Sequence, residues 1–297
     1  MAEENRNRRS CDIRVTLLGT GAPPPVMERF GPSTLVEAGG ETLLFDAGRG
    51  VLQRLSQLGK PSKEVRALFL THLHSDHLMG LPDLWLTGWL LGRPQVPFRV
   101  WGPVGTKAMM VHLDQAFEFD IRIRLYDDRP PPQGIVVHVE EIAGGLIYEH
   151  NGVKVTAFGV DHYPIQPAFG YRIDYAGRSV ALSGDTRFSE NLIRFAQGAD
   201  VLVHEVIAAD LQRAEFSSAP EWAEAIIAHH TTPEQAGEIF TRVRPKLAVY
   251  SHIVPVAATA SDLLPPTRKT YGGPVEVGED LMVIDIDDTV TVHKGPW

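Results

Sequence analysis

Residues 71–80 read THLHSDHLMG, and three histidines and one aspartate fall within the six positions from His72 to His77. The chain has 12 histidines in 297 residues, so this density is far above its average. A solitary histidine usually finds a backbone carbonyl or water as its partner. Imidazole nitrogen and carboxylate oxygen are both ligands that zinc accepts. The stretch therefore predicts a metal site.

The residues before this cluster indicate how it is held. Val65–Leu70 is a nearly continuous apolar run, which is typical of a buried strand. Side chains alternate along an extended segment, so His72 and His74 are expected to point the same way. The turn into the following helix would direct Asp76 and His77 toward a second metal position. Asp76 could also orient an attacking water as a base.

Further ligands must come from elsewhere in the chain. Three candidates follow apolar strands, where a sheet offers side chains to a cleft: His162 in FGVDHYPI, Asp185 in ALSGDTRF and His252 in LAVYSHIVP. Taken singly, each has an ordinary structural explanation, such as a core histidine, a turn cap or a strand-end residue. The only cysteine, Cys11, lies in the polar N-terminal segment, so histidine and carboxylate must hold any metal.

Strand and helix patterns recur in two similar halves. The first half begins with Ile13–Leu18 and contains a hairpin signal at Gly39-Gly40, and the second follows the proline-rich stretch 127–134. This recurrence predicts two sheets packed together with helices outside, a single α/β domain of αββα type over 13–297. Residues 1–12 are expected to form a polar N-terminal tail.

Composition limits the partners and the location. The net charge of −9 gives no overall basic field for nucleic acid or anionic lipid. The N-terminus lacks the apolar stretch of a signal peptide. The longest apolar neighbourhood, residues 78–92, is interrupted by Pro82 and Asp83 and is too short to cross a bilayer. We therefore expect a soluble, cytoplasmic protein with no membrane partner.

THLHSDH, with GTGAPPP and LLFDAG before it and SGDT, HE and SH after it, resembles the metallo-β-lactamase superfamily from Ile13 to about Ile286. That family is known for an αββα sandwich with a dinuclear zinc site between the sheets. The resemblance implies two Zn²⁺ ions per subunit, with Mn²⁺ or Fe²⁺ as alternatives. It also implies seven ligands: His72, His74 and His162 on the first ion, Asp76, His77 and His252 on the second, and Asp185 as the bridge.

Two later segments resemble one branch of that family. VLVHEVI (201–207) and AHHTTPEQAGEIF (228–240) are similar to the paired HE and HST segments of the ribonuclease Z and arylsulfatase branch. In that branch the glutamate and histidine form a proton relay, which the resemblance places on Glu205 and His230. His230 fits because it directly precedes Thr-Thr, whereas His229 does not. Without the family, Glu205 would be interpreted as a solvated carboxylate and His230 as a residue at a helix N-terminus.

The same resemblance guides the choice of substrate. Ribonuclease Z carries a long arm that grips tRNA, inserted between the positions that match His162 and Asp185, but only 22 residues separate these two here. The missing arm and the acidic charge favour a small anionic substrate over nucleic acid. We therefore expect a zinc hydrolase of phosphodiesterase or arylsulfatase type that cleaves small phosphodiesters or aryl sulfates. Alternatives are a ribonuclease Z-like endoribonuclease that processes tRNA 3′ ends, a carboxyl-ester or lactone hydrolase, and a non-catalytic zinc-binding protein.

Several residues outside the metal set have more than one interpretation. Trp85 and Trp89 lie one helical turn apart and could stack a substrate, fill the core or join a dimer partner. Dimers are common in the branch, so a homodimer is expected. Residues 253–273 could form a lid or a plain surface loop. Tyr163 and Arg172 are candidates for contact with an anionic substrate. Asp46 could fix a ligand histidine or cap the following helix.

Overall fold

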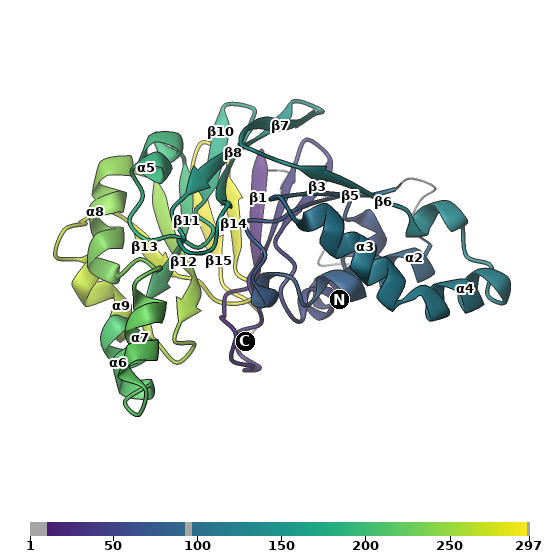
Figure 1. Ribbon diagram of the computed structural model, residues 1–297. Helices are drawn as coiled ribbons and strands as arrows, with labels where there is room; N and C mark the ends of the chain where they lie inside the picture. Colours follow the sequence, from purple (N-terminus) through teal and green to yellow (C-terminus); the bar gives the residue numbers. More distant parts are fainter. Residues whose placement is uncertain (1–10, 93–96, 296–297) are drawn as a thin grey trace.

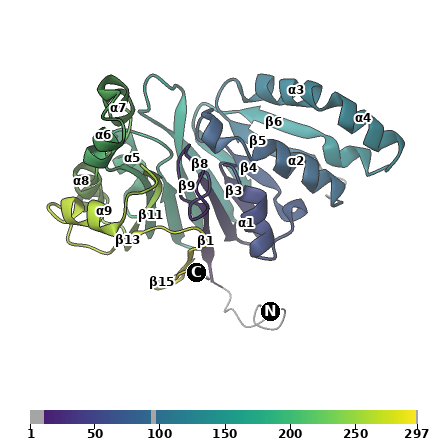
Figure 2. The same ribbon diagram turned by 90° about the horizontal axis from the view of Figure 1, so that it is seen from below.

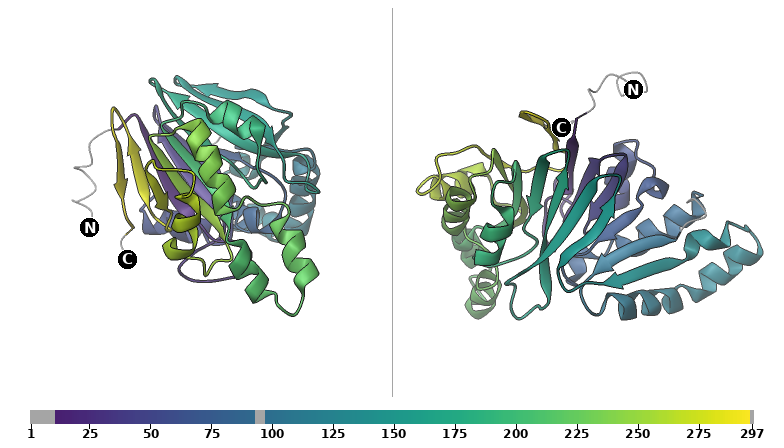
Figure 3. Two further views of the ribbon diagram at one scale, coloured as in Figure 1. Left: turned by 90° about the vertical axis from the view of Figure 1, so that its left-hand side faces the viewer. Right: turned by 90° about the horizontal axis from the view of Figure 1, so that it is seen from above.

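The computed structural model describes residues 11–92 and 97–295. Residues 1–10 of the expected N-terminal tail lie outside the described residues. Two sheets face each other at the centre of the molecule, and helices cover their outer faces, as Figure 1 and the two views of Figure 3 show. The predicted αββα sandwich is confirmed.

The first sheet has the strand order β15-β14-β1-β2-β3-β4-β5-β6. Its first strand therefore pairs with a strand from the end of the chain. The strands are β1 (Ile13–Gly19), β2 (Ser33–Ala38), β3 (Glu41–Phe45), β4 (Ala67–Phe69), β5 (Phe98–Gly102), β6 (Val137–Glu141), β14 (Val283–Ile286) and β15 (Val290–His293).

The second sheet has the order β13-β12-β11-β10-β9-β8-β7. Its central pairs β10–β11 and β11–β12 are parallel, and β11 and β12 are buried along their whole length, as parallel strands covered on both faces usually are. The strands are β7 (Gly145–His150), β8 (Val153–Val160), β9 (Ala168–Tyr175), β10 (Arg178–Leu182), β11 (Val201–Ile207), β12 (Leu247–Val254) and β13 (Val275–Val277).

Helices follow the halves of the sequence. Those of the first half are α1 (Val51–Gln57), α2 (Leu81–Leu90), α3 (Thr106–Ala116) and α4 (Glu118–Tyr126). Those of the second half are α5 (Glu190–Ala196), α6 (Ala209–Glu215), α7 (Pro220–Ile227), α8 (Pro233–Val243) and α9 (Ala260–Thr267). The described residues also form the short 3-10 turns η2 (Ser62–Glu64), η3 (Ser75–His77) and η4 (Pro132–Ile135). Figure 2 shows the two helical groups on opposite sides of the sheets.

Local sequence explains several of these boundaries. Gly39 and Gly40 both have positive φ, 57° and 78°, and they join β2 to β3 as the hairpin signal predicts. Thr232 and Gln235 form a reciprocal capping box that starts α8. The helix buries Ala236, Ile239, Phe240 and Val243, a spacing that places one face against the second sheet.

Aromatic side chains from the two sheets pack against each other near the histidine cluster. The ring of Phe69 stacks on those of Phe45 and Trp101 at centroid distances of 4.9 and 5.0 Å. It also meets the edge of Tyr171 in the opposite sheet at 5.9 Å. The hydroxyl of Tyr171 donates a hydrogen bond of 2.6 Å to the carbonyl of Leu70, so the second sheet fixes the chain just before residue 71.

Some elements are not evident in the sequence patterns. Helices α4, α6, α7 and α9 and the strands after residue 270 were not predicted, and α9 falls inside the stretch expected to be a loop or lid. Within residues 11–92 and 97–295, no helix has both the length and the apolar character needed to cross a membrane.

Candidate metal centre

The histidine cluster leaves β4 as extended chain and then turns. β4 ends at Phe69, the chain bends at Thr71, and His74 is again extended, with φ and ψ of −68° and 145°. The turn η3 then carries Asp76 and His77. As the alternation predicts, His72 and His74 fall into one group of potential ligands, and Asp76 and His77 fall into another.

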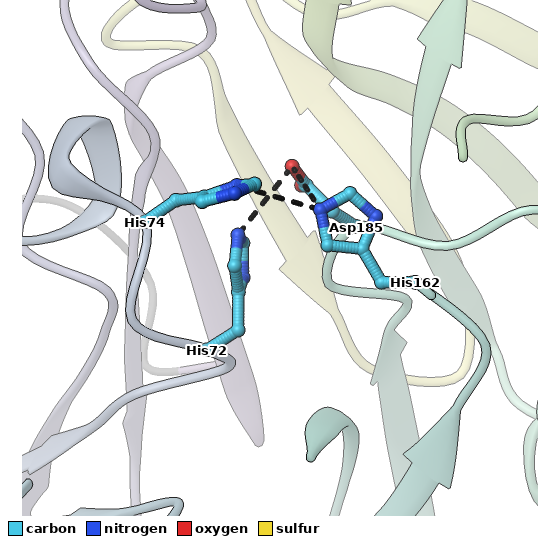
Figure 4. A group of neighbouring side chains, drawn as sticks. All are labelled: His72, His74, His162 and Asp185. Carbon is cyan, nitrogen blue, oxygen red and sulfur yellow. Dashed lines mark hydrogen bonds and ion pairs between the residues drawn. The ribbon is translucent and has the colours of Figure 1, made fainter. Parts of the chain in front are cut away.

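The second sheet supplies the remaining side chains. His162 follows β8, Asp185 follows β10 and His252 lies in β12. The Oδ2 atom of Asp185 lies 3.3 Å from Nε2 of His252, 3.4 Å from Nε2 of His77, 3.8 Å from Nε2 of His72 and 4.0 Å from Nε2 of His162. Figure 4 shows Asp185 and three of the histidines converging from both sheets. The carboxylate therefore stands between the two groups of histidines.

The polar atoms of this cluster suit metal ions. The groups whose ligand atoms lie within 4.8 Å of one another are His72, His74, His162 and Asp185, then Asp76, His77 and His252, and also Asp185, His230 and His252. Among the described residues, Nε2 of His72, Nε2 of His77 and Oδ1 of Asp185 are buried without a hydrogen-bond partner. Such orphaned atoms are costly unless an ion or ligand satisfies them. The donor set therefore fits divalent metal.

Burial and neighbouring charges set the protonation of these groups. Burial, followed by the charge of His77, lowers the pKa of His72 well below its usual range. Burial also lowers the pKa of His77, but the carboxylates of Asp185 and Asp46 outweigh it and hold that pKa well above its usual range. Burial raises the pKa of Asp185, yet His252 and His77 hold it well below its usual range. Neutral imidazole and ionised carboxylate are the metal-binding forms, and a metal charge would displace the proton of His77.

Asp46 accepts hydrogen bonds from residues of the histidine cluster. Its Oδ2 atom accepts hydrogen bonds from Nδ1 of His77 at 2.7 Å and from the hydroxyl of Thr71 at 2.8 Å, and its Oδ1 accepts from the Thr71 backbone N–H. The Thr71 hydroxyl also lies 3.0 Å from Nδ1 of His72. Helix α1 starts at Gly50 without a side-chain cap, so Asp46 orients histidine rings and does not cap the helix.

A β-bulge positions His252. The register between β11 and β12 shifts between His204 and Val206, so Glu205 faces both Ser251 and His252. His252 has a φ of 42°, a left-handed conformation that is uncommon for a residue with a side chain. Bulges and such strained conformations re-aim side chains at functional sites. The sequence gives no sign of this bulge.

His162 is held by a contact that sequence reasoning missed. Its Nδ1 atom donates to the backbone carbonyl of His229 at 2.9 Å, and its Nε2 lies 3.4 Å from Nδ1 of His74. His229 therefore contributes its main chain to the site, although the sequence assigns its side chain no role. A backbone carbonyl leaves no signature in the choice of residue, which is why the sequence could not reveal it.

The predicted relay residues lie together beside the metal ligands. Oε2 of Glu205 is 3.2 Å from Nδ1 of His230, and Oε1 accepts backbone N–H groups of Thr186 and Thr231. The ring of His230 stacks on that of His252 at a centroid distance of 5.6 Å. Burial lowers the pKa of His230 to about 4 and raises that of Glu205 well above its usual range, so the pair favours its uncharged form.

A cavity of about 540 Å³ opens onto these residues. Its walls come from the loop after β1, from the end of β12 and from the α6–α7 hairpin. It is lined by Ala22, Pro23, Pro24, His74, Asp76, Asp185, Gln212, Glu215, Phe216, Trp222, Ile226, His229, His230, His252, Val254 and Pro255. The hairpin residues were not predicted from the sequence.

A buried carboxylate fixes the loop between β1 and β2 that forms one wall of the cavity. Asp280 accepts hydrogen bonds from the backbone N–H and hydroxyl of Thr20, from the backbone N–H of Phe30 and from the guanidinium of Arg54. The closest ion-pair distance, from Arg54 to Asp280, is 2.9 Å, and both side chains are buried. This residue also lay outside the sequence-based site.

Other candidates lie away from the cavity. Trp85 and Trp89 are buried and donate through their indole N–H groups to the carbonyls of Ile135 and Pro131, so they belong to the core of the first helical layer. Arg172 pairs with Asp174 and donates to backbone carbonyls of residues 195 and 197, so it does not face the site.

The proposed lid and Tyr163 also have clear positions. Of residues 253–273, Val254 and Pro255 line the cavity, and α9 packs against α8, so this segment is not a lid. Tyr163 is exposed and is not among the residues that line the cavity. The positions of the 253–273 segment and of Tyr163 therefore do not support a direct contact of either with the substrate.

Comparisons with known proteins agree with this geometry. The family model of the beta-lactamase superfamily domain matches residues 41–253. Ribonuclease Z from Mycolicibacterium gilvum is 40% identical over 294 residues, covering 95% of this chain and 97% of that protein. Ribonuclease Z from Mycobacterium avium is 38% identical, covering 93% of this chain and 99% of that protein.

Solved structures give the same result. The short form of human tRNase Z superposes with a TM-score of 0.68 at 25% identity, covering 92% of this chain and 99% of that chain. The metallo-beta-lactamase fold protein YhfI from Bacillus subtilis superposes with a TM-score of 0.69 at 19% identity, covering 91% and 98%, which shows a common fold. The chain belongs to the metallo-β-lactamase superfamily, in its ribonuclease Z branch, and is a hydrolase of that fold.

Proposed function

We propose that this protein is a ribonuclease Z-like endoribonuclease that cleaves a phosphodiester bond at the 3′ side of tRNA precursors. The observation that carries the proposal is the 40% identity to a protein named ribonuclease Z over 95% of this chain and 97% of that one. The names of these relatives favour this alternative over the expected cleavage of small phosphodiesters or aryl sulfates. They also run against the expectation that nucleic acid is not a partner.

The missing arm does not argue against this activity. The match to the Mycolicibacterium gilvum protein spans nearly all of both chains, so the two have nearly equal lengths. That relative therefore has no room for a long additional arm, and here β9 and β10 fill the interval between His162 and Asp185. A chain can carry the name ribonuclease Z without this insertion.

The net charge is also a weak argument, because two arginines lie near the cavity without lining it. The guanidinium of Arg49 is exposed and donates to the carbonyl of Pro23, which lines the cavity. Arg187, two residues after Asp185, pairs with Asp161 and donates to the carbonyl of Tyr163. Phosphate contacts depend on such local charges more than on the charge of the whole chain.

Asp185 and six neighbouring side chains would hold two divalent ions, which we propose to be zinc. The six are His72, His74, Asp76, His77, His162 and His252. Ions bound there would lower the pKa of an attacking water and offset charge on the phosphoryl oxygens. Asp76 would orient the water, and Asp46 would keep the ring of His77 in place. Glu205 would hold His230 so that its proton reaches the leaving ribose oxygen.

The decisive experiment compares substrate classes. Metal-loaded protein is incubated with a precursor tRNA that carries a 3′ extension, with bis-aryl phosphate and with aryl sulfate, and the RNA ends are mapped. The Asp76→Ala variant is the negative control, and Asp83→Asn, an exposed carboxylate on α2, is the matched positive control. We expect one discrete cut in the precursor. Turnover of aryl sulfate with an intact precursor would contradict the proposal and restore the small-ester interpretation.

A further inference from the structure

The cavity beside the metal centre has two chemically different ends. One end is formed by the histidines and aspartates of the metal centre, including His74 and Asp185. The other end is formed by the α6–α7 hairpin and the end of β12, where the apolar side chains of Ile226 and Val254 pack together. Its volume of about 540 Å³ lies within the range of roughly 300–1,000 Å³ found for small-molecule sites.

Trp222 presents an aromatic surface at the apolar end. Its side chain is 61% exposed, and its ring meets the edge of Phe216 at a centroid distance of 4.9 Å and an angle of 69°. Phe216 thereby steadies the indole from one side. The tryptophans at 85, 89 and 101 are all buried, so Trp222 is the exposed tryptophan within the part of the chain that the structure describes. An exposed indole on a cavity wall is suited to stacking with a planar ligand.

Gln212 adds a polar group to the same wall. The residue is only 2% exposed and lines the cavity. Its backbone N–H donates to the carbonyl of Ala208 at 3.0 Å, and its side-chain amide belongs to the lining of the cavity. An amide carries two donors and an acceptor, so it can pair with complementary groups of a ligand. A ligand with polar groups on the edge of a ring would supply them.

The charged side chains in the cavity lining favour one orientation of a bound ligand. Apart from residues of the metal centre and the neighbouring histidines, the charged side chain in the lining is that of Glu215, which is exposed. A phosphate group is therefore favoured at the metal end and disfavoured at the hairpin end. A nucleotide has this polarity, with an anionic phosphate on one side and a flat, polar-edged base on the other.

We propose that the hairpin end of the cavity is a subsite for one unpaired nucleobase of the substrate RNA, stacked on Trp222 and recognised at its edge by Gln212. The proposal rests on the proposed ribonuclease function and names the part of the substrate next to the cleaved bond that the protein contacts. Base stacking on an aromatic side chain tolerates every base, whereas an amide discriminates between base edges. Trp222 would therefore supply affinity for the base, and Gln212 would determine which base is preferred.

A binding experiment tests the subsite without any cleavage. In a Trp297→Phe background, metal-loaded protein is titrated with the four ribonucleoside 5′-monophosphates while tryptophan emission is recorded. Ribose 5-phosphate serves as the control without a base, and phenyl phosphate as the control without base-edge groups. We expect saturable quenching by at least one mononucleotide, none by ribose 5-phosphate, and loss of the signal in Trp222→Phe.

Three results would overturn this assignment. Absence of quenching by every mononucleotide would exclude stacking on Trp222. Equal quenching by ribose 5-phosphate would show that phosphate alone causes the signal. Binding of phenyl phosphate as tight as that of the best mononucleotide would show a general aromatic pocket in which Gln212 recognises nothing.

A cleavage experiment separates the subsite from the function. Precursor RNAs are prepared with a single abasic residue at successive positions around the cut. We expect one position where the abasic residue lowers kcat/KM roughly 5- to 150-fold, the range for loss of one stacked base. Trp222→Ala should cause a similar loss on the intact RNA and no additional loss on that abasic RNA. Gln212→Leu should reduce the difference between bases at that position. Phe119→Ala, which removes an exposed aromatic ring on α4, is the matched control.

The outcomes distinguish the two proposals. If the wild-type protein cuts the precursor and no abasic position affects the rate, the subsite is refuted and the ribonuclease function stands. If mononucleotides quench Trp222 and no RNA is cut, the nucleobase subsite stands and the ribonuclease function is refuted.

Discussion

Oε2 of Glu205 lies 3.2 Å from Nδ1 of His230, and the remaining carboxylate oxygen accepts two backbone N–H groups. These contacts hold the carboxylate from both sides, so the imidazole is fixed relative to β11. The Nε2 atom of His230 is left for a second partner in the cavity. This arrangement is suited to delivering a proton to a leaving group.

We predict that Glu205→Gln and His230→Ala each lower kcat on precursor RNA about 10²- to 10⁴-fold, the usual contribution of general acid catalysis. The ribose oxygen is a poor leaving group and needs a proton. Nitrophenolate does not, so turnover of bis(p-nitrophenyl) phosphate should change little. The double variant should be no worse than His230→Ala, since both residues act in one step. Equal losses on both substrates would contradict the relay and indicate damage to the metal site.

A second prediction concerns Asp46. Asp46→Asn keeps the shape of the side chain but weakens its acceptance of hydrogen bonds from His77 and Thr71. Residues behind metal ligands typically affect metal affinity by about 10- to 100-fold. We expect the metal affinity of Asp46→Asn to be lower than that of the wild type by this factor, as measured by competition with a chelating dye. Asp83→Asn, whose carboxylate accepts from Thr87 on the exposed face of α2, should bind metal as the wild type does.

Removal of metal should lower stability as well as activity. Without metal, buried carboxylates such as Asp185 and Asp76 depend on histidine charges for compensation. Ligands that bind the folded state stabilise it by about 2.7 kcal/mol when their free concentration is 100 times Kd. We expect chelation to lower Tm by several degrees and added zinc to restore both Tm and activity. Metal analysis of the purified protein would then test zinc against manganese and iron. An unchanged Tm after complete metal removal would contradict this prediction.

Asp280 provides a prediction about stability far from the reaction. Asp280→Ala removes the carboxylate that pairs with the buried guanidinium of Arg54, and breaking a buried ion pair typically costs about 3–5 kcal/mol. Urea unfolding should register this loss. Arg213→Met removes an exposed ion pair with Glu224 and should leave the midpoint unchanged. A similar midpoint for all three proteins would show that the Asp280 contacts do not stabilise the fold.

A fifth prediction concerns pH. Burial lowers the pKa of His204 to about 4, and its Nε2 has no hydrogen-bond partner among the described residues. The unfolded chain, with a histidine pKa near 6.5, then binds more protons than the folded protein between about pH 4 and 6.5. Stability therefore falls as pH decreases through this window, by up to about 3 kcal/mol for this residue.

The measurement compares metal-free wild type with His204→Leu by urea unfolding at pH 7 and pH 5. The variant lacks the titrating group, so its free energy of unfolding should decrease less on acidification. If both proteins lose the same free energy of unfolding, the low pKa of His204 is disproved. Metal-free protein is used because acid also releases metal from the other histidines.

The sequence predicts those features of the fold and site that depend only on residues close together in the chain. Alternation places His72 with His74, the turn separates Asp76 and His77, and Gly39-Gly40 forms its hairpin. Convergence of His162, Asp185 and His252 on the cluster depends on pairing between distant strands, and only a resemblance to the family indicated it. The bulge at His252 and the main-chain contact of His229 leave no pattern in residue types.

The sequence patterns did not reveal the cavity wall formed by α6 and α7, for a related reason. Helices α6 and α7 are short, and Phe216 and Trp222 are conspicuous only once the hairpin places them beside the metal centre. The expectation of a small ester rested on the acidic total charge and the missing arm, which describe the whole chain, whereas the names of the relatives favour the ribonuclease alternative.

The pairing of β1 with β14 and the anchoring of the loop after β1 by Asp280 affect the order of events during synthesis. The ribosome makes the histidine cluster early, but the wall carrying Pro23 gains its anchor only after residue 280 has emerged. A nascent chain therefore contains all seven candidate metal ligands, the last at residue 252, before this wall of the cavity has its anchor at residue 280.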